Sequence, residues 1–317
     1  MIDQYKEKKM GTDFKKIIPK TMSTPEQLPA SPEEEATWQE ANRSFWEQNP
    51  MRYDWDQNLE FKEHTEDFYK EVDRRFFSNV SEFMPWNRIP FDNLIDFDTL
   101  GSKNVLEIGV GTGSHAQLLA AHAANFTGID LTESAVKSTS ERMRLLNLKA
   151  EILQMDAERL SFPDSSFDFI WSWGVIHHSS NTDQIMKEMY RVLKPGGKAV
   201  IMVYHRGLWN YYICGGLITG IFKGELFKTR SIFKTVQRHT DGALARYYTS
   251  QSWHDLAKSG GFKVDYLIVK GSKAELFPIP RGTLKNFLVR LTPNGISRFF
   301  TNRCKMGSFL ISKITKT

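Results

Sequence analysis

The stretch that decides the fold is residues 105–114, which read Val-Leu-Glu-Ile-Gly-Val-Gly-Thr-Gly-Ser. The apolar run from Lys103 to Gly109 is typical of a short buried strand that closes on glycine. Gly109, Gly111 and Gly113 let the chain turn sharply, and they let a ligand approach the backbone with no Cβ in the way. The helix that follows would present unpaired N–H groups at its start. We therefore expect a ligand site at the carboxyl end of this strand.

Two acidic residues narrow the choice of ligand. Glu107 ends the first strand, and Asp130 closes the next apolar run, residues 125–130. An acid about 20 residues beyond such a loop meets ribose hydroxyls in nucleotide-binding folds. A carboxylate at the mouth of the loop suits a ligand with a cationic amino group better than it suits a pyrophosphate. The glycine pattern also fits the dinucleotide fingerprint, so a nicotinamide-dependent oxidoreductase stays as an alternative.

Apolar strands and helical segments alternate from about residue 100 onward. This alternation predicts a largely parallel sheet with helices on both faces. We expect an α/β protein, a Rossmann-like αβα sandwich with a mostly seven-stranded sheet. The expected strands are 103–109, 125–130, 149–155, 167–173, 198–204, 263–269 and 309–314.

The chain divides into three parts. Residues 1–30 are rich in lysine and proline and predict a flexible leader. Residues 31–100 predict an N-terminal helical cap rich in aromatic side chains, with one helix starting at residues 31–34 and a second over 61–77. The main domain, 101–317, carries a lid insertion after the fifth strand at 206–249 and a basic excursion at 272–305.

The composition bounds the class of protein. The 317 residues are 40% apolar and 25% charged, as in an ordinary globular protein. The two cysteines, Cys214 and Cys304, fit neither a disulfide framework nor a zinc site, so no metal is expected. The first residues lack an apolar signal core, and the longest apolar run, 211–222, is too short to span a bilayer. These features predict a cytoplasmic protein.

The net charge of +5 is not spread evenly, because residues 276–317 contain no Asp or Glu. A basic segment of this kind can contact nucleic acid or an anionic membrane surface. We favour the plainer interpretation, a solvated basic face. Nucleic acid is therefore an unfavoured partner, and peripheral membrane contact is allowed but not favoured.

Six segments together carry a family resemblance. Besides residues 105–113, they are Gly-Ile-Asp at 128–130, Met-Asp-Ala at 155–157, Leu-Ser-Phe-Pro-Asp-Ser-Ser-Phe-Asp at 160–168, Gly-Val-Ile-His-His at 174–178 and Arg-Val-Leu-Lys-Pro-Gly-Gly at 191–197. The chain resembles a class I S-adenosylmethionine-dependent methyltransferase, of the group that includes quinone and small-molecule methyltransferases. The resemblance covers residues 100–205 strongly and 250–270 weakly, and it implies S-adenosylmethionine as cofactor and a small-molecule acceptor.

The resemblance also implies roles for single residues. The acid and glycines of the loop would line the methionyl part, Asp130 would meet the ribose, and Asp156 would meet the adenine amino group. Trp173 and Gly174 would close over the methionyl side. The expected cofactor-binding residues are Glu107, Gly109, Gly111, Gly113, Asp130, Leu131, Asp156, Ala157, Trp173 and Gly174.

The reaction itself indicates which side chains to look for on the acceptor side. A hydroxyl or ammonium acceptor must lose a proton, which requires a base, whereas a thioether requires none. His178 is favoured as that base because it follows the fourth strand, and His205 at the end of the fifth strand is the second candidate. The acceptor atom, O, N or S, stays open. The expected acceptor-binding residues are Tyr53, Trp55, His177, Tyr204, Tyr211 and Tyr247.

Two other functions compete with this interpretation of the sequence. A nucleic-acid methyltransferase acting on an exocyclic amine would carry an acid or Asn, two prolines and an aromatic after the fourth strand, where this chain has Ser-Trp-Gly-Val at 172–175. An enzyme acting on a cytosine carbon would need a nucleophilic cysteine there. A binding protein that kept the cofactor pocket without turnover is the second alternative. Intact Glu107, Asp130 and Asp156 weigh against it.

Overall fold

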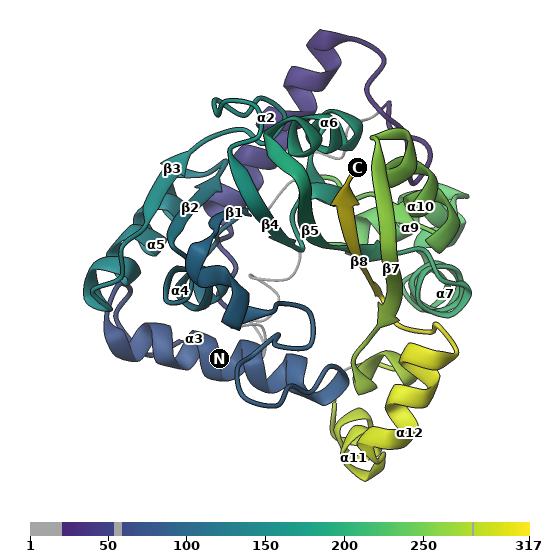
Figure 1. Cartoon of the computed structure of the whole chain (residues 1–317). Helices are drawn as coiled ribbons and strands as arrows, with labels where there is room; N and C mark the ends of the chain where they lie inside the picture. The colour runs from purple at the N-terminus through teal and green to yellow at the C-terminus, as the bar shows by residue number, and fades with distance from the viewer. Residues whose placement is uncertain (1–20, 54–58, 281) are drawn as a thin grey trace.

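The computed structural model describes residues 21–53, 59–280 and 282–317. Its centre is a sheet with the strand order β3-β2-β1-β4-β5-β8-β7, and the two-residue strand β6 pairs with β5 outside this order (Figure 1). The predicted α/β sandwich with a mostly seven-stranded sheet is thereby confirmed. The strands are β1 (Asn104–Ile108), β2 (Asn125–Asp130), β3 (Glu151–Gln154), β4 (Phe167–Trp173), β5 (Leu193–His205), β6 (Tyr247–Tyr248), β7 (Phe262–Lys270) and β8 (Phe309–Lys316).

The direction of the strands fixes one functional edge. Strands β1 to β5 pair in parallel, and β8 runs antiparallel between β5 and β7. Glu107 of β1 pairs with Gly128 of β2 on one side and with Trp171 of β4 on the other. The carboxyl ends of the parallel strands therefore meet at the same edge, where ligands bind in open α/β sheets.

Helices cover both faces of the sheet (Figure 1). Before β1 come α2 (Pro32–Gln48), α3 (Glu66–Phe83) and η1 (Phe97–Ser102). The crossovers between parallel strands contain α4 (Ser114–Ala120), α5 (Glu133–Leu145), η2 (Ile176–His178) and α6 (Thr182–Val192). After β5 come η3 (Leu208–Ile218), α7 (Thr219–Phe222), α8 (Glu225–Thr229), α9 (Ile232–His239), α10 (Ser250–Ser259), η4 (Lys273–Leu276), α11 (Thr283–Leu291), α12 (Asn294–Arg298) and η5 (Phe299–Arg303).

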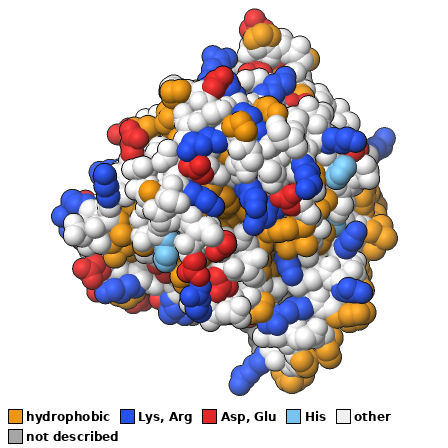
Figure 2. All heavy atoms as spheres, viewed as in Figure 1, with side chains coloured by type: hydrophobic (Ala, Val, Ile, Leu, Met, Phe, Trp, Pro, Cys, Tyr) orange, Lys and Arg blue, Asp and Glu red, His pale blue; other side chains and the backbone are white. Residues whose placement is uncertain are grey.

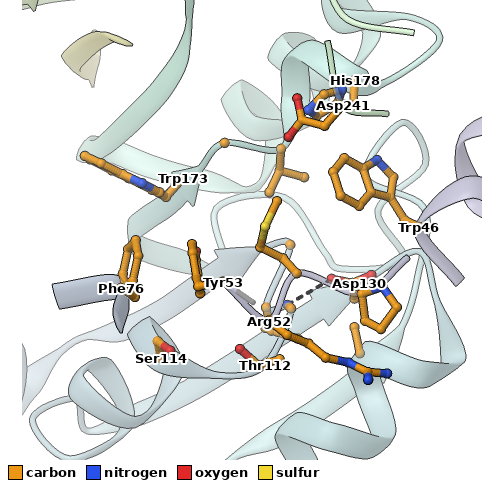
Figure 3. Close-up of a pocket in the computed structure, with 18 of the residues that line it drawn as sticks. Trp46, Arg52, Tyr53, Phe76, Thr112, Ser114, Asp130, Trp173, His178 and Asp241 are labelled. Carbon is orange, nitrogen blue, oxygen red and sulfur yellow. Dashed lines mark hydrogen bonds between the residues drawn. The ribbon is translucent and has the colours of Figure 1, made fainter. Parts of the chain in front are cut away.

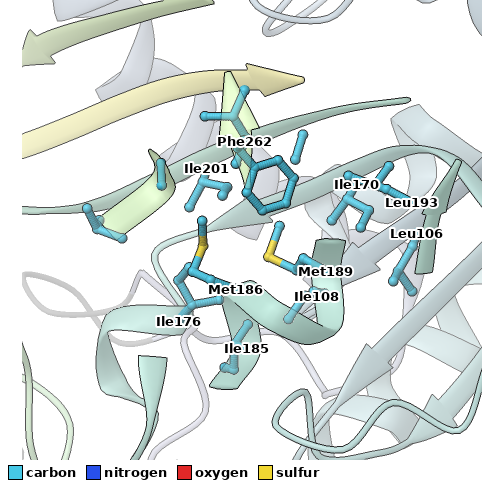
Figure 4. Packing of buried hydrophobic residues seen from close by; sticks show 14 of the residues in the cluster. Leu106, Ile108, Ile170, Ile176, Ile185, Met186, Met189, Leu193, Ile201 and Phe262 are labelled. Atoms are coloured by element: carbon cyan, nitrogen blue, oxygen red, sulfur yellow. The ribbon is translucent and has the colours of Figure 1, made fainter. Parts of the chain in front are cut away.

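The sheet buries an apolar cluster on each face because side chains alternate along a strand. Leu106 and Ile108 of β1 point to the face covered by α6, where they join Met186 and Met189 (Figure 4). Val105 points to the opposite face, which α3 and α4 cover. Together these two clusters hold the strand ends, and hence the loops beyond them, in fixed positions.

The starts of both N-terminal helices follow from capping. Ser31 accepts a hydrogen bond from Glu34 N (3.3 Å) and Pro32 occupies the first turn, as the sequence predicts. The second helix was expected over residues 61–77, but α3 spans Glu66–Phe83. Thr65 caps it by accepting from Phe68 N, and two acids follow in its first turn, so the helix begins later than predicted.

Residues 194–197, Lys-Pro-Gly-Gly, lie where helix α6 gives way to strand β5. Helix α6 ends at Val192, and β5 begins directly at Leu193. The pairing of β4 with β5 shifts register between Phe167 and Phe169, and Gly196 has φ +75°. Residues 194–197 therefore form an irregular interruption of the ladder between β4 and β5. Within the described ranges, no helix has the length and apolar character that crossing a membrane requires.

Candidate functional site

A cavity of about 1510 Å³ lies at the carboxyl edge of the sheet (Figure 3). The loops after β1, β2, β3 and β4 and the end of β5 line it, together with residues of α2, α3, η4 and α11. Pockets for single small ligands measure roughly 300–1,000 Å³, so this cavity has room for two. Figure 3 shows the rings of Tyr53, Phe76 and Trp173 on one side of it and those of Trp46 and His178 on the other.

The glycine loop forms an open cradle in the wall of this cavity. Gly109, Gly111 and Gly113 have φ values of +83°, +53° and +82°, in the left-handed region that favours glycine. A Cβ on Gly109 would lie 2.2 Å from Val175 Cγ2, whereas a Cβ on Gly111 would meet no atom within 4 Å. The sequence therefore needs glycine at 109 for packing, and glycine at 111 leaves space open to a ligand.

Helices α3 and α5 hold the loop from behind through Arg142. This side chain is only 1% exposed, and its guanidinium donates to Thr112 O (3.0 Å) and pairs with Asp73. The ring of Tyr69 lies 5.0 Å from its charged carbon, which adds a cation–π contact. The buried ion pair thus ties two helices to the backbone of the loop.

Glu107 is buried, and among the described residues its Oε2 atom has no hydrogen-bond partner. Burial and the nearby charge of Asp130 raise the pKa of this carboxyl well above its usual range. Its Oε1 atom lies 3.6 Å from Nδ1 of His115, whose pKa burial and Arg142 lower to about 3. His115 lines the cavity, but Glu107 lies behind it and does not. An unpaired buried carboxyl oxygen of this kind is a ready acceptor for a cationic amino group.

Asp130 organises the second loop. Its Oδ2 atom accepts from Gly111 N (3.2 Å), and Oδ1 accepts from the backbone and hydroxyl of Thr132 at 3.0 and 2.8 Å. Burial raises the pKa of Asp130, and these hydrogen bonds oppose that rise. The carboxylate lines the cavity next to the glycine cradle, so it links the shape of one loop to the other.

Helix α2 closes the cavity from the opposite side. Gln39 donates to Oδ1 of Asp156 (2.8 Å) and accepts from Ser180 N (3.1 Å). Asn42 donates to the backbone carbonyl of His178, and Trp46 packs edge-on against the His178 ring at 5.0 Å. Gln39, Asn42 and Trp46 are spaced i, i+3, i+7, which places them on one face of the helix.

His178 is held in one orientation at the cavity wall. Its Nδ1 lies 2.8 Å from Leu244 O, so the neutral ring carries its proton on Nδ1 and its lone pair on Nε2. Nearby, Tyr204 donates to Asp241 Oδ1 (2.7 Å), and burial followed by Asp241 raises the pKa of that phenol well above its usual range. Figure 3 shows Asp241 beside His178.

The structure brings most of the predicted cofactor residues together. Gly113 and Glu107 do not line the cavity. Those that do are Gly109, Gly111, Asp130, Leu131, Asp156, Ala157, Trp173 and Gly174.

The predicted acceptor residues divide more evenly. Tyr53 and Tyr204 line the cavity, as does His178, the predicted base. Tyr211 and Tyr247 pack against each other outside it, with ring centres 4.8 Å apart. Trp55 lies outside the described residues.

Two of the histidines singled out from the sequence, His177 and His205, are not at the cavity wall. His205 is buried, with its Nδ1 2.9 Å from Gly307 O, and does not line the cavity. Successive side chains of a strand point to opposite faces, so Tyr204 and His205 cannot both face the site. His177 is buried behind His178 with its ring 4.0 Å from that of Tyr204, and burial lowers its pKa well below the usual range.

Several cavity residues were missed from the sequence. Gln39 and Asn42 could have been recognised from the sequence, because their spacing places them beside Trp46 on one face of the predicted cap helix. Asp241 gave none, because it follows α9 in an insertion without a recognisable motif. Within the described ranges, no three His, Cys, Asp or Glu side chains form a group that could hold a metal ion.

Comparison with known proteins places this site in a family. Residues 106–201, which hold the glycine loop, Asp130, Asp156 and His178, match the family model described as a methyltransferase domain. Residues 106–201 thus form a methyltransferase domain, and they are similar to class I S-adenosylmethionine-dependent methyltransferases.

The curated relatives share only this part. The phthiotriol/phenolphthiotriol dimycocerosates methyltransferase of Mycobacterium tuberculosis is 38% identical over 31% of this chain and 36% of its own length. The phosphatidylethanolamine N-methyltransferase of Cereibacter sphaeroides is 35% identical over 31% of this chain and 49% of its own. The 2-methyl-6-phytyl-1,4-hydroquinone methyltransferase of Synechocystis is 38% identical over 33% of each chain. The match therefore spans no more than half of the length of these relatives.

One solved structure shows the extent of the likeness in three dimensions. A S-adenosylmethionine-dependent methyltransferase from Methanosarcina mazei is 20% identical, with a TM-score of 0.49, over 70% of this chain and 96% of that one.

The residues at the cradle fit S-adenosylmethionine, the cofactor of this family. The space at Gly111 admits a ligand, and Asp130 offers a carboxylate to hydroxyls. Glu107 has one oxygen without a partner among the described residues, but it lies behind His115 and does not line the cavity. Asp156 already accepts from Gln39 through one oxygen.

Proposed function

We propose that this protein transfers the methyl group of S-adenosylmethionine to a small-molecule acceptor in the cavity at the carboxyl edge of its sheet. The observation that carries the proposal is the position of the cavity. One part of it is the open cradle at Gly111, within the matched methyltransferase domain, and another part reaches His178, Tyr204 and Asp241. Its volume of about 1510 Å³ accommodates a cofactor and an acceptor together.

The cofactor half is formed by the loops after β1, β2 and β3. Gly109 and Gly111 would hold the methionyl part, with Glu107 buried behind them. Asp130 and Leu131 would hold the ribose, and Asp156 with Ala157 the adenine. When bound, the cofactor supplies a methyl group on a sulfonium whose leaving group is a neutral thioether. Hydrogen bonds to a charged group contribute about 1.5–3 kcal/mol each, so Asp130 is the most informative residue to remove.

The acceptor half has a base and a polar pair. His178 would take the proton of a hydroxyl or ammonium acceptor on Nε2, because its Nδ1 is held against the Leu244 carbonyl. Tyr204 and Asp241 form a hydrogen-bonded pair that can orient a polar acceptor group. Helix α2 and Trp46 cover this region and would exclude water, so positioning supplies part of the rate.

The class of acceptor is a small molecule, and its atom is left to experiment. The relatives are named for phosphatidylethanolamine, for a phytyl hydroquinone and for phthiotriol dimycocerosates, so their acceptors differ from one another. If the acceptor of this protein is a thioether, no proton leaves and His178 has no role as a base. A screen for S-adenosylhomocysteine release over a metabolite panel identifies the acceptor.

The base is tested with that acceptor in His178→Ala. For a hydroxyl or ammonium acceptor, the variant should lose about 10²–10⁴ in kcat while cofactor affinity changes little. In the wild type kcat should fall as the pH falls and the base becomes protonated, and the variant should lack this limb. His205→Ala is the matched control, because His205 is also buried but lies outside the cavity. A His178→Ala enzyme with full rate and an intact limb would remove His178 from the proposal.

A further inference from the structure

Large hydrophobic side chains are exposed on one part of the surface. Among the described residues, all of them except Phe61 and Leu146 lie in two segments, 208–227 and 284–300. Phe222 is 76% exposed and Phe227 72%, so most of the surface of both rings is in contact with water. We call the surface formed by these two segments the apolar face. Contiguous exposed apolar areas of this kind mark sites of interaction.

The two segments form one continuous surface. Trp209 of η3 donates its indole N–H to Glu275 O (2.9 Å), which joins the first segment to η4, and η4 contacts α11 and α12 of the second. Figure 2 shows hydrophobic side chains gathered along the lower right of the molecule, over the positions of α7 and of α11 and α12 in Figure 1.

Positive charge surrounds the apolar face. The exposed cations on the same two segments and on the turn that follows them are Lys223, Lys228, Arg230, Arg290, Arg303 and Lys305. Residues 206–240 contain one acidic residue, Glu225, and residues 276–317 contain none. Glu225 is itself paired with His239 (3.1 Å). Phe, Leu and Ile side chains among Lys and Arg are the composition of surfaces that lie in the interface of a bilayer.

We propose that the apolar face docks the protein on the surface of an anionic membrane. The apolar side chains would enter the boundary between headgroups and acyl chains, and the cations would contact lipid phosphates. A nucleic acid would satisfy the cations but leave Phe222 and Phe227 in water. A second copy of the chain would bring two sets of like charges together. The plainer interpretation of the sequence, a solvated basic face, does not explain the exposed hydrophobic side chains on the same elements.

Helix α11 connects this face to the cavity. Leu284, Phe287 and Leu291 are exposed on one stripe of the helix with the spacing i, i+3, i+7. Lys285 and Val289, one helical turn apart, line the cavity instead. Docking would therefore bring one wall of the cavity to the bilayer. The docking proposal itself goes beyond methyl transfer and does not depend on it.

Co-sedimentation with vesicles tests the docking, with no cofactor or acceptor present. The full chain should bind phosphatidylcholine vesicles that contain phosphatidylglycerol, bind weakly to phosphatidylcholine alone, and lose affinity as salt is raised. Phe222→Ser with Phe227→Ser should weaken the binding about tenfold or more, since two large side chains no longer enter the bilayer. Phe61→Ser with Leu146→Ser is the matched control, because these exposed side chains lie off the apolar face.

Each other outcome contradicts the proposal. A folded wild type that does not bind either kind of vesicle excludes docking, and equal loss in both double variants excludes this face as its site. Reversible dimerisation without vesicles that the Phe222 and Phe227 substitutions abolish would show that a second copy occupies the face. Binding to RNA in a gel shift that is as tight as binding to vesicles, and unaffected by those substitutions, would show that only the cations matter.

Discussion

Asp130 links two loops of the site through one carboxylate, which accepts from Gly111 and twice from Thr132. We predict that Asp130→Ala weakens S-adenosylmethionine binding by about 1.5–3 kcal/mol, as expected for hydrogen bonds to a charged group. Calorimetric titration measures this. Asp168→Ala is the matched control, since Asp168 accepts from Asn104 N and Lys194 Nζ at the other end of the strands. Unchanged affinity in a folded Asp130→Ala protein would exclude Asp130 from the cofactor site.

His177 gives a second test at the scale of one residue, through the pH dependence of stability. Burial keeps its ring neutral in the folded chain, whereas the unfolded chain takes up a proton as the pH falls through about 6.5. The unfolded state then binds more protons, so His177 lowers the free energy of unfolding as the pH falls. Replacement by Phe should reduce the slope of that free energy between about pH 7 and pH 5 by up to ~1.4 kcal/mol per pH unit.

Denaturant unfolding at several pH values measures the slope in both proteins. An equal slope in the wild type and in His177→Phe would mean that the His177 ring is protonated in the folded chain. His254→Phe serves as the control for replacing a histidine by Phe, because His254 is exposed on the surface of α10.

Some single-residue features were predictable and others were not. The glycine loop and Asp130 were predictable, because a turn and a strand end have local sequence signatures that do not depend on distant parts of the chain. The orientation of the rings of His177 and His178 was not predictable. His177 and His178 are neighbours in a 3₁₀ turn, and only the packing of Tyr204, Trp46 and Leu244 around them decides which ring reaches the cavity.

Helix α2 is the element that completes the site. Besides its contacts to Asp156 and His178, its Glu47 accepts from the backbone N–H groups of Glu133 and Ser134 at 2.9 and 3.0 Å, at the start of α5. The sequence predicted the helix from Ser31 and Pro32 but not its position, since none of these long-range contacts has a local signature. We propose that α2 is the element of the predicted cap that covers the ligand site. The predicted lid, 206–249, contributes Asp241 to the cavity lining.

Hydrogen exchange tests this assignment of elements. When cofactor and acceptor are added, exchange should slow in α2 and around Asp241, because both line the cavity. It should stay unchanged in α7 and α8, which belong to the apolar face. A response confined to residues 100–205 would mean that neither α2 nor the insertion covers the ligands.

At the scale of the whole molecule, the cofactor site and the apolar face are separate surfaces joined by α11. The alternation of strands and helices was predictable because each parallel crossover leaves an alternating pattern in the sequence. The apolar face was not predictable, since a sequence does not show whether its Leu and Phe side chains are buried or exposed. Their exposure became visible only in the folded chain.

The most direct test of the account is a calorimetric titration of S-adenosylmethionine into three proteins: the wild type, Gly111→Val and Gly196→Val. Both glycines have positive φ, at +53° and +75°, and a Cβ on either one would meet no atom within 4 Å. The two substitutions therefore carry similar backbone strain, but only Gly111 lines the cavity. We predict that the wild type and Gly196→Val bind the cofactor, and that Gly111→Val, while folded, does not. Equal binding by Gly111→Val and the wild type, or no binding by a folded wild type, would contradict the central claim.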